Sequence, residues 1–145
     1  MYTEEILDDY EDDGTMPANV TELSQAVVGH KIISAGNVEV PSGWGVDQTV
    51  FQIELDNGKK VQLAPGGDCC AYTALEQFLL HPDKVDHMIM GVGTTEEYTT
   101  WHIYADWGDV LELTVGWSAG NVGYYGYGFD INVVDVDGDS NDTEI

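Results

Sequence analysis

Apolar and polar residues alternate most regularly in the first half of the chain, on either side of a turn signal. Phe51, Ile53 and Leu55 fall on one side of an extended segment whose other side is mostly polar. Asp56-Asn57-Gly58 follows, and asparagine and glycine tolerate the positive φ angles of tight hairpin turns. Lys59–Leu63 then returns with its apolar residues on the same side. The pattern predicts a β-hairpin with one apolar face.

Two other segments have apolar residues at helical spacing. The first helix is predicted to begin at Thr21, which can cap it, and to end at Gly29. The second is predicted over Cys69 to His81, with Pro82 just beyond its end. The apolar face of the first comprises Leu23, Ala26 and Val27, and that of the second comprises Tyr72, Leu75, Phe78 and Leu79. We therefore expect two short helices.

The remaining extended segments are joined by short connections. They comprise Lys31–Val40, Val85–Val92, Tyr98–Asp106, Asp109–Gly116 and a last strand at about Tyr127–Val136. Gly93-Thr94-Thr95 and Trp107-Gly108 are typical of hairpin turns, which favours an antiparallel meander. The whole pattern predicts an α+β fold: a mainly antiparallel sheet of six or seven strands with two short helices.

Charge changes the picture of what this domain can contact. The 145 residues contain 27 Asp and Glu against four Lys and no Arg, a formal net charge of −23. Direct nucleic-acid binding is not expected, because that affinity comes mainly from basic side chains that neutralise phosphates. No membrane binding is expected either, since anionic surfaces repel the chain and no apolar run approaches the roughly 20 residues that span a bilayer. A protein with a basic surface is the expected partner; solubility or a high-salt habitat would also account for the acidity.

The acids divide the chain into three parts. We expect an acidic, flexible leader over residues 1–18, a single α+β domain over 19–136 and an acidic tail over 137–145. No secretory signal is visible, and the only cysteines are adjacent, which favours reduced thiols and a cytoplasmic location. The leader's seven acids are candidate partner-binding residues: Glu4, Glu5, Asp8, Asp9, Glu11, Asp12 and Asp13.

A glycine- and tyrosine-rich segment before the last strand is a second candidate contact surface. Tyrosine and tryptophan give large contact areas at low entropic cost. The candidate contact residues are Trp117, Tyr124, Tyr125 and Tyr127. The alternative is that this segment folds its aromatic side chains back over the edge of the sheet.

Metal-binding candidates are less defined. Alternation allows His87 and His102 to share one face of neighbouring strands, but no third ligand follows from the pattern. Cys69 and Cys70 follow a glycine pair at the start of the predicted helix, where a thiol is activated; buried structural cysteines are the alternative. Acids at alternate positions in the tail resemble the start of a calcium loop without its glycine and final acid: Asp135, Asp137 and Asp139.

Five segments together resemble a family of small proteins of unknown function found mostly in actinobacterial phages and their hosts. They comprise Gly67–Thr73, Gly91–Thr95, Tyr98–Tyr104, Leu111–Trp117 and Tyr124–Phe129. The resemblance extends from Val20 to Val136 and implies a phage or prophage context. It implies no catalytic residue and no cofactor, and the acidic leader and tail lie outside it.

The leading hypothesis is a phage accessory protein in the host cytoplasm that binds a host protein. Its carboxylates would replace nucleic-acid phosphates in a basic binding site, so that the chain acts as a mimic or inhibitor. The second hypothesis is a small-ligand or metal-binding enzyme that uses His87, His102 and Cys69 or Cys70. The third is a structural or virion-associated module without an activity of its own. No catalytic residue, cofactor or oligomeric state is assigned.

Overall fold

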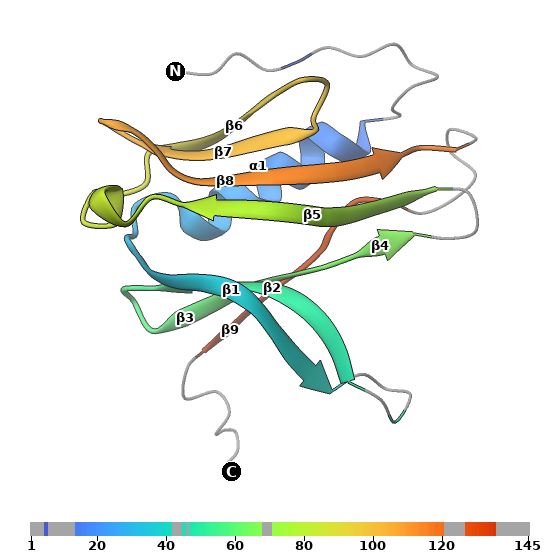
Figure 1. Ribbon diagram of the computed structural model, residues 1–145, viewed down its shortest axis with the longest axis horizontal. Coiled ribbons are helices and arrows are strands. Elements are labelled where there is room, and N and C mark those ends of the chain that lie inside the picture. Colours follow the sequence, from blue (N-terminus) through green and yellow to red (C-terminus); the bar gives the residue numbers. More distant parts are fainter. Residues whose placement is uncertain are drawn as a thin grey trace.

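The computed structural model describes residue 5 and residues 14–41, 45, 47–67, 71–120 and 127–135. Nine strands in these residues form two antiparallel sheets, with strand orders β1-β2-β3-β9 and β4-β5-β8-β7-β6 (Figure 1). The elements are α1 Thr15–Val27, β1 Ile32–Pro41, β2 Asp47–Leu55, β3 Lys59–Ala64, β4 Gly66–Gly67, β5 Tyr72–Leu80, the 3-10 helix η1 Pro82–Lys84, β6 Gly91–Thr95, β7 Thr100–Ala105, β8 Gly108–Ser118 and β9 Asp130–Asp135.

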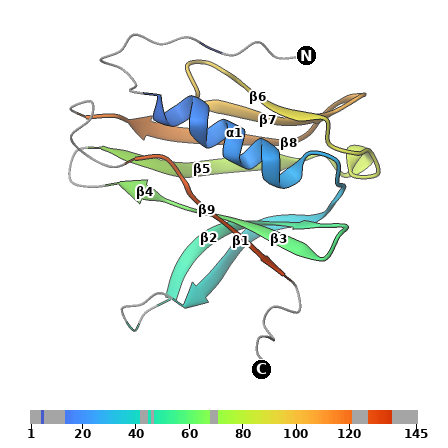
Figure 2. The same cartoon turned by 180° about the vertical axis from the view of Figure 1, so that it is seen from behind.

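The helix and the two sheets enclose one apolar core. Figure 2 shows α1 lying along one face of the five-stranded sheet, with the four-stranded sheet beneath. Leu23 of α1, Ile53 of β2 and Trp101 of β7 are each completely buried in this core. The opposite face of the five-stranded sheet, turned toward the reader in Figure 1, is not covered by α1.

The hairpin predicted from the alternating pattern is confirmed. β2 and β3 pair antiparallel, and Phe51, Ile53 and Leu55 are buried on the apolar side. Asp56 and Asn57 form the turn, and Gly58 has a φ of 86°, which a residue with a Cβ rarely adopts.

The first helix is longer than predicted at its amino end. It begins at Thr15, not Thr21, after Gly14 with a φ of 105°. Pro17 lies in the first turn, where the amide hydrogen it lacks has no intrahelical acceptor. Met16 of the added turns is completely buried, so packing overrides the cap signal at Thr21. The helix therefore begins within the segment assigned to the leader.

A buried polar contact joins α1 to the start of β9. The Asn19 Nδ2 group donates to the Phe129 carbonyl at 3.0 Å, and the Phe129 amide donates to Asn19 Oδ1 at 2.9 Å. The neighbouring Gly128 amide donates to Thr73 Oγ1 of β5 at 2.7 Å. These side chains satisfy backbone groups that no strand partner reaches, as burial requires.

The second predicted helix is wrong over its described residues, which form strand β5. β5 carries a bulge between Leu75 and Gln77 in its pairing with β8. The extra residue, Glu76, resets the alternation, so Leu75 and Phe78 both pack against the core although three positions separate them. Apolar residues three positions apart are also typical of one face of a helix, which is why the pattern predicted a helix here. Cys69 and Cys70 lie outside the described residues.

The strand predicted over Val85–Val92 is also wrong for most of its length. Turns follow η1, and β6 begins only at Gly91. Ile89 is buried and exchanges backbone hydrogen bonds with the chain just after α1. Gly93-Thr94-Thr95, predicted as a turn, lies within β6, and the turn follows it at residues 96–99.

The α+β class and the mainly antiparallel arrangement are confirmed, but the predicted numbers of strands and helices are wrong. The described residues contain nine strands instead of six or seven, and one α-helix instead of two. Among these residues, no helix combines the length and the apolar character that crossing a membrane requires.

Candidate functional site

Three exposed apolar side chains lie in the two segments next to His87 and Asp106. Trp107, in the turn between β7 and β8, is 70% exposed, and Met88 and Met90 are 53% and 60% exposed. His87 joins the two segments: its Nδ1 atom lies 3.2 Å from an Asp106 carboxylate oxygen, and its ring is 6.5 Å from the Trp107 ring. The segment that carries the two methionines therefore lies beside the β7–β8 turn.

Three aspartates lie near these apolar groups in the sequence. Asp83, Asp86 and Asp106 are all exposed, and they flank the segment and the turn that carry the apolar residues. Lys84 lies among them, and its Nζ atom is 3.8 Å from Asp83. We call this the tip surface; it consists of Asp83, Asp86, Met88, Met90, Asp106 and Trp107.

The turn at the other end of β7, residues 96–99, forms hydrogen bonds with other parts of the chain, and we call it the closed turn. Glu96, Glu97 and Tyr98 all have φ near 60°, a left-handed conformation that residues with a Cβ seldom adopt. The amides of Glu97 and Tyr98 donate to the two carboxylate oxygens of Glu5 at 2.8 and 2.7 Å. The Tyr98 hydroxyl donates to the Glu5 carbonyl at 2.8 Å. One leader acid is thus bound by the domain itself.

Trp117 covers the same closed turn. Its indole nitrogen donates to the Glu97 carbonyl at 2.9 Å, and its ring stacks on Tyr127 with centroids 6.0 Å apart. Both side chains pack against the core. This geometry corresponds to the alternative in which aromatic residues fold over the sheet. The other predicted contact residues lie outside the described residues: Tyr124, Tyr125, Glu4, Asp8, Asp9, Glu11, Asp12 and Asp13.

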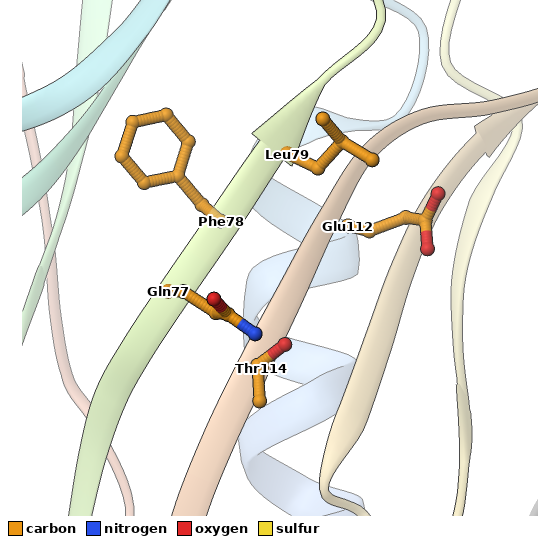
Figure 3. Close-up of a pocket in the computed structure, with 5 residues that line it drawn as sticks. All are labelled: Gln77, Phe78, Leu79, Glu112 and Thr114. Atoms are coloured by element: carbon orange, nitrogen blue, oxygen red, sulfur yellow. The ribbon is translucent and has the colours of Figure 1, made fainter.

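The uncovered face of the five-stranded sheet contains a shallow hollow of about 380 Å³. Strands β5 and β8 line it, and Figure 3 shows the Glu112 side chain directed away from β5 while Phe78 points to the opposite side. The lining residues are Gln77, Phe78, Leu79, Glu112 and Thr114.

Histidines and carboxylates meet beside this hollow. His102 Nδ1 lies 2.8 Å from Asp109 Oδ2, and His102 Nε2 lies 2.8 Å from the Thr95 hydroxyl. His81 Nε2 lies 2.7 Å from Glu112 Oε2. His102, Asp109 and Glu112 each place one ligand atom within 4.8 Å of the others. These three residues are called the His102 cluster below.

Of the predicted metal candidates, His102 alone belongs to this cluster. His87 lies in the turn after η1, beside Asp106 instead. Asp135 ends β9, where its backbone is in register with that of Lys59 in β3, while Asp137 and Asp139 lie outside the described residues.

Sequence reasoning missed the carboxylate members of the cluster. The predicted turn at Trp107-Gly108 could not have found them, because a two-residue turn there would place Leu113 opposite His102. The observed pairing of His102 with Glu112 and the position of Asp109 both depend on the register shift in the hairpin.

Comparison with known proteins places the chain in a family. The model of a family described as a domain of unknown function, DUF7448, matches residues 25–131. No curated protein matches the chain. No solved structure matches it either.

Proposed function

Because this chain belongs to the DUF7448 family, a domain of unknown function, its activity must be inferred from its surface, and we propose that it binds a basic protein segment at the tip surface. The observation that carries this proposal is the exposure of Met88, Met90 and Trp107 in segments that also carry exposed aspartates. The partner would insert an apolar side chain between them and surround it with Lys or Arg.

Burial of the apolar side chains of the tip surface would provide binding free energy. Each large apolar side chain gains roughly 1.5–3 kcal/mol when it is fully removed from water. Methionine adapts its shape to different partners, and tryptophan is among the residues that most often dominate binding energy. A cluster of three such side chains at an exposed turn is unusual for a surface with no partner.

Charge supplies the choice of partner. The whole chain carries a net charge of −23, which attracts a basic surface over long distances and accelerates encounter. Asp83 and Asp106 have side chains that are 78% and 60% exposed, so they remain available to pair with incoming cations. The same charges repel nucleic acid directly.

The resemblance to small phage proteins supports a host protein as the partner. We infer a phage accessory role in the host cytoplasm, in which the acidic chain occupies a basic site that otherwise holds nucleic acid. Trp107 would then supply the close contact, and the surrounding carboxylates would take the positions of phosphates.

A peptide titration tests the proposal. One synthetic peptide alternates Lys with Leu, and a second of equal length and charge alternates Lys with Ser. The Lys–Leu peptide is expected to bind more tightly by calorimetry at low salt and to weaken as salt rises. Replacing Met88 and Met90 by Ser and Trp107 by Ala should weaken its binding at least about tenfold, as expected for a central apolar anchor.

Two matched variants locate the binding. Ile33→Ser with Val133→Ser removes exposed apolar side chains from the four-stranded sheet, and Glu22→Gln with Asp47→Asn removes exposed charge elsewhere. Neither should change the Lys–Leu affinity more than about twofold. Equal weakening in the tip variant and in these controls would mean that net charge alone attracts the peptide. The tip surface would then not be the site.

A capture experiment addresses the host partner. The chain is immobilised and exposed to nuclease-treated bacterial lysate at low salt, beside the tip variant and the Ile33→Ser, Val133→Ser control. A nucleic-acid-binding protein retained by the native chain and the control, and lost from the tip variant, is expected. Retention of the same proteins by all three would contradict the proposal.

A further inference from the structure

The β7–β8 hairpin brings three metal-ligating side chains to one place. His102 pairs directly with Glu112 across the hairpin, so their side chains stand on the same face of the sheet. The register then shifts between Ile103 and Tyr104, and Tyr104 pairs with Asp109. This bulge turns Asp109 to the face that holds His102, while Val110 is buried. Bulges often redirect a side chain in this way beside functional sites.

The imidazole of His102 is held at both nitrogens. Its side chain is only 11% exposed, with Asp109 at Nδ1 and Thr95 at Nε2, each at 2.8 Å. A metal-ligating histidine typically uses one nitrogen for the ion and fixes the other through a hydrogen bond. Thr95 Oγ1 can accept that bond from Nε2–H, so that Nδ1, on the side of the carboxylates, becomes the ligand atom.

His81 plays the corresponding part for Glu112. Its Nε2 atom lies 2.7 Å from Glu112 Oε2, and it comes from the end of β5, outside the hairpin. The pair holds one carboxylate oxygen in place, and the adjoining hollow gives water and ions access to Glu112. Each side chain of the cluster therefore has a hydrogen-bond partner. His102 contacts Thr95 and Asp109, and Glu112 contacts His81.

The geometry points to a divalent transition-metal site at His102, Asp109 and Glu112, with Thr95 and His81 as supporting residues. One imidazole and two carboxylates suit Zn²⁺, Mn²⁺ or Fe²⁺, whereas Mg²⁺ and Ca²⁺ prefer oxygen ligands throughout. His102 Nδ1 and Asp109 Oδ2 are 2.8 Å apart, and they would have to separate to roughly 3.3 Å to bind a tetrahedral ion together. The ion would take the place of the proton between these two atoms, and the neutral imidazole would carry its proton on Nε2, where Thr95 accepts it.

Zinc titration of the chelator-treated full chain tests this inference. Calorimetry is expected to show one Zn²⁺ bound per chain. Co²⁺ should give a visible absorption band typical of nitrogen and oxygen ligands. Mg²⁺ at the same concentration should leave both signals unchanged.

Variants decide whether the cluster holds the ion. Glu112→Gln should weaken Zn²⁺ binding at least about tenfold, and His102→Gln should do the same if urea unfolding shows that it folds. The control is His87→Gln with Asp106→Asn, a second histidine–carboxylate pair at 3.2 Å, which should leave the affinity within about twofold. Equal affinity in Glu112→Gln and in the native chain would overturn the inference, as would binding with no change in the Co²⁺ band of the variant.

Discussion

The two turns that flank β7 differ in how their polar and aromatic groups are satisfied. Between β6 and β7, three consecutive residues adopt left-handed backbone, and the side chains of Glu5, Trp101 and Trp117 form hydrogen bonds with that turn. Between β7 and β8, Trp107 stands in solvent with acids beside it. The first turn is completed from within the chain, and the second leaves apolar surface that only another molecule can cover.

The difference teaches where binding is to be sought in this molecule. Leader acids and the aromatic segment were the sequence-based candidates for partner contact, but Glu5 and Trp117 are engaged in the closed turn. Using either for a partner would require breaking hydrogen bonds within the domain. Trp107 is already exposed, so a partner can contact it without that cost. The β7–β8 turn is therefore the better place for an external contact.

The largest expected contrast concerns the aromatic residues of the two turns. Tyr98 is 1% exposed, and Tyr98→Ala should lower the free energy of unfolding by about 3–5 kcal/mol, because it opens a cavity in the core. Trp107→Ala, at an exposed site, should change it by less than about 0.5 kcal/mol. Urea unfolding followed by circular dichroism measures both. Similar losses in the two variants would mean that the β7–β8 turn is not open.

The hydrogen bonds between Glu5 and the closed turn should give the second-largest effect on stability. Glu5→Ala removes the acceptor of two backbone amides and should cost about 1–2 kcal/mol, given that the site is half-buried. Glu22→Gln, on the exposed side of α1, is the matched control and should cost almost nothing. Hydrogen exchange of the Glu97 and Tyr98 amides should accelerate in Glu5→Ala alone. Unchanged exchange would show that the turn holds its shape without the leader.

Backbone conformation should give effects of opposite sign in the two turns. Glu96 has a φ of 59° and an exposed side chain, so Glu96→Gly should raise the free energy of unfolding by up to about 1 kcal/mol through relief of strain. Gly108→Ala should lower the free energy of unfolding by about 1–2 kcal/mol, because Gly108 has a φ of 123°, although the space around it is open. Thermal and urea unfolding check both signs. A loss of stability in Glu96→Gly would mean that its side chain, not Glu5, supports the turn.

Elements defined by local signals could be predicted from the sequence. The β2–β3 hairpin needs only its alternation and Asp56-Asn57-Gly58, and both are local. The carboxyl end of α1 is similarly marked by Gly29, which has a φ of 88°. By contrast, α1 begins at Thr15 because Met16 and Asn19 bury against distant parts of the chain, and no neighbouring residue signals that.

The errors arise where a single inserted residue or a distant partner decides the structure. Glu76 interrupts the alternation of β5 and makes a strand resemble a helix. The β6–β7 turn lacks glycine because two distant residues support its left-handed backbone: Glu5 accepts hydrogen bonds from its amides, and Trp117 donates one to a carbonyl. In the candidate metal site, His102 was found by alternation, whereas Asp109 depends on a register shift that no sequence pattern marks.

The smallest effect is expected from the ion pair inside the tip surface. His87 Nδ1 and Asp106 Oδ1 lie 3.2 Å apart, but the side chains are 33% and 60% exposed, so solvent screens their attraction. A double-mutant cycle with His87→Gln and Asp106→Asn should give a coupling energy below about 0.5 kcal/mol, which falls further as salt rises. Because so little holds the pair together, a basic partner can recruit Asp106 at almost no cost to the fold. A coupling energy several times larger would mean that the β7–β8 turn is stabilised internally, like the β6–β7 turn, and the contrast between the two ends of β7 would then disappear.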